Sequence, residues 1–333
     1  MPYGGPMNPK LAALLLVLAG TPPLLSLHGP AAPTPGPQEK PRKLHVFLLA
    51  GQSNMEGQAV VDLDHEQHYN GGRGTLAKLL EQPEFEERWG WVRDEGGSWR
   101  EREDVGVWYR SANEEKKGPL SIGYAVYPGR HHFGPELAFG KVLGDRFEGP
   151  VLLVKACWGG KSLHVDFRPP SAGGEVGPYY ERMFEELDAA LADVGAAFPQ
   201  WKDLEPELEG FVWFQGWNDG CDGEATRSYA DSLEHLIDDV RARLDSKKLP
   251  VVVGQTGNMN NPALHEGQEA GAKAARRRGP TAFVETDDFL RAAEDSPNTG
   301  HGHHWYGNSE SYLLVGDAMG SAMVELLPKA RRR

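Results

Sequence analysis

Residues 44–57, LHVFLLAGQSNMEG, decide the fold: a mostly apolar run ends abruptly in a polar turn that contains glycine. A short, nearly continuous apolar run such as 44–49 suits a strand that is buried on both faces of a parallel sheet. Similar runs recur at 151–154 (VLLV), 211–214 (FVWF), 251–253 (VVV) and, more weakly, 281–284 (TAFV). The sequence therefore predicts five strands of one parallel sheet.

Helical patterns lie between and after these runs. Apolar residues recur at helical spacing over 183–194, 229–244 and 312–326. Strands that alternate with helices are typical of an open α/β sheet. We therefore expect an α/β fold.

Length and charge exclude several classes of protein. The chain has 333 residues, enough for one or two domains, and 35 Lys and Arg against 48 Asp and Glu give a net charge of −13. This acidity argues against non-specific binding to nucleic acid and against docking on anionic membranes. Two cysteines are too few for a disulfide scaffold or a four-cysteine zinc site. A globular enzyme or ligand-binding protein remains.

The first forty residues differ from the rest. Lys10 precedes an apolar run over 11–27, and Pro/Ala/Gly-rich sequence follows as far as Gln38. This order is typical of a secretory signal peptide with a linker, and a retained N-terminal anchor is the alternative. We expect residues 1–40 to be this segment and 41–330 to be the folded domain. Export would expose Cys157 and Cys221 to oxidising conditions, but the sequence does not decide whether they pair.

A long insertion interrupts the alternation of strands and helices. Residues 62–130 are charged and rich in glycine, and a segment of this length in a domain is either functional or disordered. Its scattered aromatic residues favour a packed insertion that overhangs a site. They are Trp89, Trp91, Trp99, Trp108, Tyr109, Tyr124 and Tyr127.

Residues with catalytic potential follow the predicted strands, where open α/β sheets bind ligands. Ser53, in a glycine-containing turn, is a candidate nucleophile or a helix cap. The pair Gly159–Gly160 lets backbone N–H groups approach an oxyanion, or serves only as a turn. The amide of Asn218 could donate to the same oxyanion, although amides are also common turn formers.

Three histidines, at 301, 303 and 304, precede the last predicted helix. One of them can act as a general base if the fold brings it beside Ser53. The alternatives are a metal site, for which the chain lacks a His-Glu-x-x-His motif, and exposed histidines without a function.

Together these segments resemble an SGNH-type hydrolase, and more narrowly the sialate O-acetylesterase and acetylxylan esterase-like carbohydrate esterases. The resemblance covers roughly residues 43–327. It rests on GQSNM (51–55), Gly159–Gly160, WFQG (213–216), the late histidine and FGPE (133–136). It implies a three-layer α/β/α sandwich with a flavodoxin-like sheet, and hydrolysis of acetyl esters on sugars without a metal or organic cofactor.

The resemblance also implies roles for individual residues. Ser53 matches the nucleophile and His304 matches the histidine, since aromatic residues and a helix follow it. The N–H of Gly160 would join that of Ser53 in the oxyanion hole, with Asn218 as the side-chain donor. The aromatic residues of the insertion are then candidates for stacking on sugar rings.

Two departures remove the usual acids that orient the histidine. His301 stands where the family places Asp, and Trp217 stands where the esterase subgroup often has Glu. The histidine still needs a partner for its second nitrogen. We consider a backbone carbonyl or a carboxylate, with support from neighbouring amides. The candidates are Asp219, Asp222, Asp288 and Asp295, with Gln52 and Gln215 in support.

The sequence thus predicts a secreted serine esterase that acts on acetylated carbohydrate. It predicts no nucleic-acid partner and no stable membrane insertion after signal removal. A non-catalytic glycan-binding relative of the same fold and a lipase or thioesterase of this fold are the alternatives. The identity of the sugar is left open.

Overall fold

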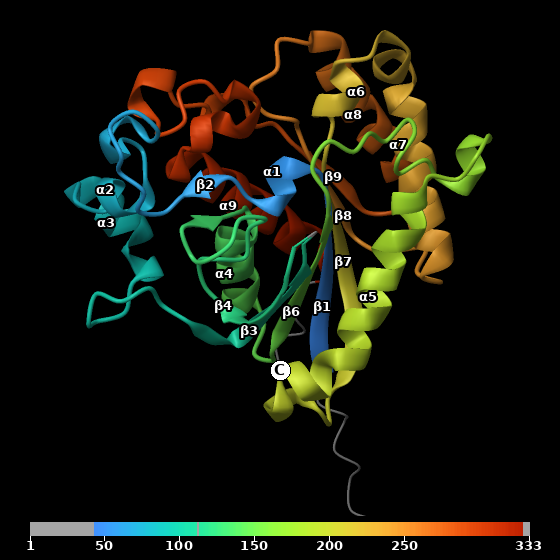
Figure 1. Cartoon of the computed structure of the whole chain (residues 1–333). Coiled ribbons are helices and arrows are strands. Elements are labelled where there is room, and N and C mark those ends of the chain that lie inside the picture. Colours follow the sequence, from blue (N-terminus) through green and yellow to red (C-terminus); the bar gives the residue numbers. More distant parts are fainter. Residues whose placement is uncertain (1–42, 112, 329–333) are drawn as a thin grey trace, which may run out of the picture. The chain divides into compact units, whose positions relative to one another are not determined.

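The five predicted strands lie side by side in one sheet of the computed structural model, which describes residues 43–111 and 113–328 (Figure 1). They are β1 (Lys43–Gly51), β6 (Val151–Cys157), β7 (Glu205–Phe214), β8 (Val251–Gly254) and β9 (Thr281–Val284). These strands are parallel and lie in the order β6-β1-β7-β8-β9. In terms of the predicted runs this is 2-1-3-4-5, the flavodoxin-like order.

The insertion adds two further strands to the sheet. Strand β3 (Arg102–Arg110) runs parallel to β6, and β4 (Glu115–Leu120) is antiparallel to β3 at the edge. The sheet therefore has seven strands rather than five. The buried run VGVWY (105–109) supplies the apolar part of β3, and the charged residues that flank it obscure it in the sequence. Strands β2 (Ala59–Val60) and β5 (His132–Phe133) form a separate antiparallel pair.

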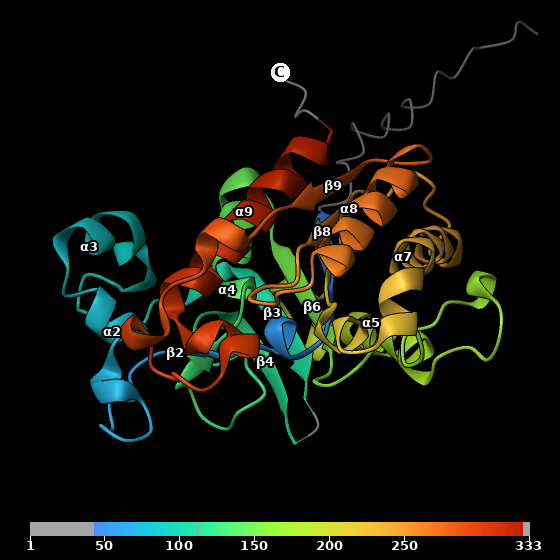
Figure 2. The same ribbon diagram turned by 90° about the horizontal axis from the view of Figure 1, so that it is seen from above.

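Helices cover both faces of the sheet, which confirms the three-layer α/β/α arrangement (Figure 2). Helices α4 (Glu136–Arg146) and α9 (Ser309–Leu326) pack on one face. Helices α5 (Pro178–Ala197), α7 (Gly223–Arg243) and α8 (Pro262–Arg276) pack on the other. Side chains of β1 alternate between the two layers, so Phe47 and Leu49 face α9 whereas Val46 and Leu48 face α5 and α7.

Short helices occupy the connecting segments. The α-helical ones are α1 (Ser53–Glu56), α2 (Leu76–Leu79), α3 (Pro83–Trp89) and α6 (Trp217–Gly220). The 3₁₀ turns are η1 (Asn70–Gly72), η2 (Gly90–Val92), η3 (Pro170–Ala172), η4 (Pro199–Trp201), η5 (Asp287–Phe289), η6 (Ala293–Asp295) and η7 (Gly302–Gly307).

Most aromatic residues of the insertion belong to the core, which corrects the expectation that they overhang a site. Trp89, Trp108, Tyr109 and Tyr124 are buried. Trp91 and Trp99 are partly buried and pack against the core cluster under α4 and α9. Tyr127 alone among the seven is exposed. The insertion is thus largely a structural extension of the sheet.

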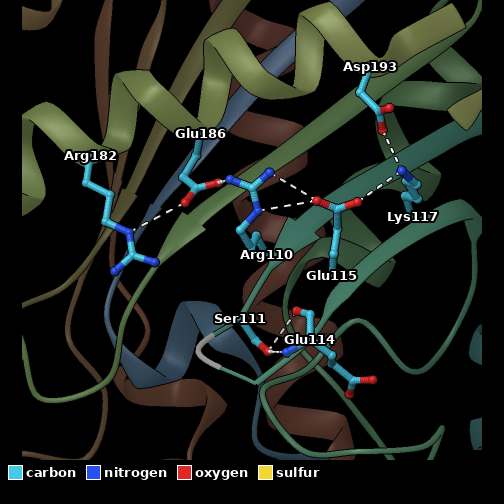
Figure 3. Close-up of polar contacts among 8 residues, drawn as sticks. All are labelled: Arg110, Ser111, Glu114, Glu115, Lys117, Arg182, Glu186 and Asp193. Carbon is cyan, nitrogen blue, oxygen red and sulfur yellow. Dashed lines mark hydrogen bonds and ion pairs between the residues drawn. The ribbon is translucent and has the colours of Figure 1, made fainter. Parts of the chain in front are cut away.

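A chain of charged side chains holds the hairpin of β3 and β4 against α5 (Figure 3). The carboxylate of Glu186 on α5 is almost fully buried and lies 3.2 Å from the guanidinium of Arg110 and 3.5 Å from that of Arg182. Burial raises the pKa of Glu186, and the two arginines oppose that effect. The chain continues from Arg110 through Glu115 and Lys117 to Asp193. Alternating charges therefore connect two layers of the domain.

The expected signal segment, residues 1–40, lies outside the described residues. Within the part that is described, no helix combines the length and the apolar character needed to cross a membrane. Cys157 at the end of β6 is buried, Cys221 after α6 is exposed, and both are free thiols.

A buried lysine joins four segments beneath the carboxyl end of the sheet. The ammonium of Lys155 on β6 lies 2.8 Å from the carboxylate of Glu136, and both side chains are 0% exposed. It also donates to the backbone carbonyls of Glu56 (3.1 Å) and Tyr124 (2.5 Å). Glu136 in turn accepts a hydrogen bond from the N–H of Gly134. Every charge in this cluster has a partner, as burial requires.

We expect Lys155→Met to lower the free energy of unfolding by about 3–5 kcal/mol, because it leaves the buried carboxylate of Glu136 without a counter-ion. Adding Glu136→Gln removes that charge while keeping an acceptor for Gly134, so the double variant should be more stable than Lys155→Met alone. Urea unfolding measures both effects. Lys78→Met in the exposed pair with Glu81 is the control, with a change within about 0.5 kcal/mol. Equal losses in Lys155→Met and Lys78→Met would contradict the prediction.

Candidate active site

The register of the central strands brings three polar segments to the same edge of the sheet. Gly51, the last residue of β1, pairs with Cys157 of β6 and with Phe214 of β7. The turns after these three parallel strands therefore start at the same level. Ser53, Gly160 and Asn218, which the sequence placed after separate strands, consequently share one edge.

The turn that carries Ser53 depends on glycine. Gly51 has φ of +154°, and a Cβ atom at this position would lie 2.1 Å from the carbonyl oxygen of Phe214. A side chain is therefore excluded, and β1 can turn sharply between its two neighbours. Ser53 is the first residue of the single-turn helix α1. Its N–H group therefore has no hydrogen-bond acceptor within the helix.

The imidazole of His304 lies against the serine. Its Nε2 is 3.0 Å from Oγ of Ser53, across 251 positions of sequence. His304 lies in η7, where the buried ring of Trp305 packs so tightly on Gly257 that a Cβ there would lie 2.0 Å from the indole. The structure thus brings together the two residues assigned as nucleophile and base.

Two further side chains hold the histidine turn, and sequence reasoning gave neither a role. The amide of Asn54 donates to the carbonyl of His303 (3.1 Å) and accepts from the hydroxyl of Tyr312 on α9 (2.6 Å). Asn54 is the neighbour of Ser53, so one residue connects α1, η7 and α9. Its place in the GQSNM stretch is the signal that could have identified it.

The imidazole of His304 is uncharged. Burial, followed by the neighbouring His303 and His301, lowers the pKa of His304 to about 3. The rings of His303 and His304 are 4.0 Å apart, and the ring of Trp217 is 5.5 Å from that of His303. Throughout the described ranges, no carboxylate bonds His304, and no group of three His, Cys, Asp or Glu side chains is placed to hold a metal.

Asp219 is not the partner of the histidine, which corrects one of the alternatives for the acid. Its carboxylate accepts hydrogen bonds from the N–H groups of Leu163 and His164, at 2.8 Å each, and from the amide of Gln215 at 2.6 Å. Burial raises the pKa of Asp219, and these donors oppose the effect. Asp219 therefore anchors the segment that follows Gly160. Asp222 instead caps α7.

Glutamine and asparagine side chains connect the three turns. Gln52 donates to Oδ1 of Asn218 (3.1 Å) and accepts from the N–H of Gly216 (3.0 Å). Nδ2 of Asn218 donates to the carbonyl of Gly160 (2.9 Å). Because Nδ2 carries two hydrogens, one remains for a ligand. Gln215 donates to the carbonyl of Lys161, so both glutamines support the turns.

Glu56 is a buried residue of the site that sequence reasoning did not assign. It lies one helical turn after Ser53, and its carboxylate lies against Gly159, where a Cβ atom would be 3.0 Å from Oε2 of Glu56. Burial raises the pKa of Glu56, while Gly159 and Lys155 oppose the effect. The side chain of Glu56 therefore lies between α1 and the glycine pair.

The arrangement contains the parts that acyl transfer requires. A hydroxyl contacts a neutral imidazole, and backbone N–H groups and an amide lie at the same edge. Donors placed in this way can stabilise the oxyanion of a tetrahedral intermediate.

Comparisons with known proteins identify the family. A family model described as carbohydrate esterase, sialic acid-specific acetylesterase, matches residues 43–325. A probable carbohydrate esterase of Arabidopsis thaliana is 25% identical over 210 residues, which span 62% of this chain and just under two thirds (66%) of that protein.

Solved structures were compared as well. An Arabidopsis thaliana protein has the same fold, with a TM-score of 0.54, 14% identity, and coverage of 86% of this chain and 99% of that one. A carbohydrate acetylesterase from Xanthomonas citri is 16% identical, with a TM-score of 0.43 over 83% of this chain and 56% of that one. Since the family model covers most of the sequence, the chain belongs to the carbohydrate esterase family described as sialic acid-specific acetylesterases.

Proposed function

We propose that this protein is a serine esterase that removes O-acetyl groups from carbohydrates, either sialic acid or acetylated polysaccharide. One observation carries the proposal: Oγ of Ser53 lies 3.0 Å from Nε2 of His304, at the sheet edge that also carries Gly160 and Asn218. Membership of a carbohydrate esterase family supports the substrate class.

In the first step, His304 accepts the proton of Ser53 while Oγ attacks the carbonyl carbon of the acetyl group. The N–H groups of Ser53 and Gly160 and the amide of Asn218 stabilise the oxyanion. His304 then donates its proton to the oxygen of the departing sugar. Water attacks the acetyl-serine in the second step and releases acetate.

His304 does this work without a carboxylate partner. The low pKa keeps the imidazole neutral, so one ring nitrogen is free to accept a proton. In place of an acid, the Asn54 and Tyr312 contacts fix the backbone of the histidine turn. A base with a low pKa is a weaker proton acceptor, so orientation contributes more than basicity.

A non-catalytic glycan-binding protein is the second candidate. The observation that favours it is that, among residues 43–111 and 113–328, His304 has no acidic hydrogen-bond partner. The Ser53–His304 contact favours the enzyme.

The N-terminal sequence pattern supports a proposal about where in or outside the cell the protein acts. A basic residue, an apolar run and a Pro/Ala-rich segment before residue 41 are typical of an exported chain. We infer that the esterase acts on glycans outside the cytoplasm.

Replacing the nucleophile tests the proposed function. Ser53→Ala should reduce release of p-nitrophenol from p-nitrophenyl acetate, and of acetate from acetylated sugars, by at least about 10³-fold. Ser171→Ala, which changes an exposed serine of η3, is the control and should retain full activity. A Ser53→Ala variant as active as the parent would refute the proposal, and a parent that binds glycans without releasing acetate would favour the binding protein.

Asn218→Ala tests the oxyanion hole. We expect kcat to fall about 10²–10³-fold with little change in KM, since the lost donor acts mainly in the transition state. Steady-state kinetics with p-nitrophenyl acetate measures both parameters, with Asn260→Ala as an exposed control. An unchanged kcat would remove Asn218 from the oxyanion hole.

The pH profile tests the neutral histidine. Since the pKa of His304 is near 3 rather than 6.5, the base stays unprotonated as the pH falls through 6.5. We expect kcat/KM for p-nitrophenyl acetate to remain level from about pH 8 to about pH 5 and to fall only in stronger acid. An acid limb with its midpoint near 6.5 would contradict this prediction.

A further inference from the structure

One aromatic residue of the insertion lies on the surface, unlike the rest. Tyr127 is 40% exposed and belongs to the loop between β4 and β5. Large aromatic side chains are normally buried, since they carry much apolar surface. An exposed aromatic ring that is also held in place offers a fixed apolar surface to a ligand.

Tyr127 is connected to the nucleophile turn through a single amide. Its hydroxyl donates to Oε1 of Gln58 at 2.7 Å, and Nε2 of the same Gln58 donates to the backbone carbonyl of Ser53 at 3.1 Å. Gln58 is buried, so its side chain has little freedom. The phenol ring therefore lies beside α1.

The loop that carries Tyr127 is held by an internal cation. Nζ of Lys116 donates to the carbonyls of Gly123 (2.9 Å), Ala125 (2.8 Å) and Tyr127 (2.6 Å). On one side the ring of Tyr127 contacts that of His132, with centroids 4.4 Å apart. Hydroxyl, backbone and ring are thus each fixed, and an aromatic surface held in this way loses little entropy when a ligand binds.

We propose that Tyr127 is a specificity residue whose ring stacks on the apolar face of the sugar that carries the acetyl group. The proposal rests on the function proposed above. Sugar rings present C–H groups on one face, and the electron-rich face of an aromatic ring attracts them. Burial raises the pKa of Tyr127, which keeps its hydroxyl protonated as the donor to Gln58.

A positioning role is the competing explanation: in that case the hydroxyl of Tyr127, through Gln58, would hold the backbone of Ser53. The two roles involve different atoms. Stacking needs the ring, whereas support of Gln58 needs the hydroxyl. Tyr127→Phe and Tyr127→Ala separate them.

The test measures kcat/KM of the full chain on an O-acetylated oligosaccharide and on p-nitrophenyl acetate, which has no sugar. We expect Tyr127→Ala to lower kcat/KM for the oligosaccharide about tenfold, mostly through KM, and to change p-nitrophenyl acetate less than about twofold. Tyr127→Phe should retain most of the oligosaccharide activity. Leu290→Ala is the control: Leu290 is 37% exposed and directly follows η5, whose Phe289 accepts a hydrogen bond from Ser311 on α9.

The following results of this test would overturn the stacking proposal. Equal losses on both substrates in Tyr127→Ala, or a loss in Tyr127→Phe as large as in Tyr127→Ala, would overturn stacking in favour of positioning. If kcat/KM of Tyr127→Ala on both substrates equals that of the parent, the stacking proposal is overturned while the esterase proposal stays intact. A parent protein that hydrolyses p-nitrophenyl acetate but no acetylated sugar would refute both.

Discussion

The close approach of two backbones at the end of β1 is the constraint on which the site depends. The α-carbon of Gly51 faces the carbonyl oxygen of Phe214 so closely that any side chain would collide with it. Because no side chain intervenes, β1 ends level with its neighbours β6 and β7 and turns at once into α1. The turns that follow β1, β6 and β7, which are far apart in the sequence, thereby meet around Ser53. Lys155 and Glu56 support this meeting point from below, one from β6 and the other from α1.

The sequence was informative where a single local pattern determined the structure. Apolar runs located the five central strands because strands buried on both faces must be apolar along their length. Strand β3 was missed because its apolar part, 105–109, contains a glycine and lies among charged residues whose partners are distant in sequence, such as Glu186. The polar residues after each strand were found because parallel strands end at one edge. Tyr312 was not found, since its contact with Asn54 joins positions 258 apart and no local pattern around Tyr312 reveals it.

The missing acid shows a different limit of sequence reasoning. Several aspartates were candidates by proximity in sequence, yet the buried Asp219 is occupied by backbone donors from the segment after Gly160. The carboxylate of Asp219 stabilises the fold by accepting from these buried N–H groups, because a buried N–H group without a partner destabilises the folded state. The histidine instead lies among other imidazoles and is kept neutral by burial. Asn54 and Tyr312 thus hold the histidine turn, a task that a carboxylate partner would otherwise share.

The two borders of the sheet have a consequence for the protein in concentrated solution. On one side β4 is the outermost strand, and its sequence, EKKGPL, contains two lysines and a proline that has no N–H to offer. On the other side β9 is only four residues long. A border that is short, charged or interrupted by proline is a poor template for strands from another copy of the chain. Intermolecular strand pairing, the usual route by which exposed sheet borders lead to aggregation, is thereby discouraged at both ends.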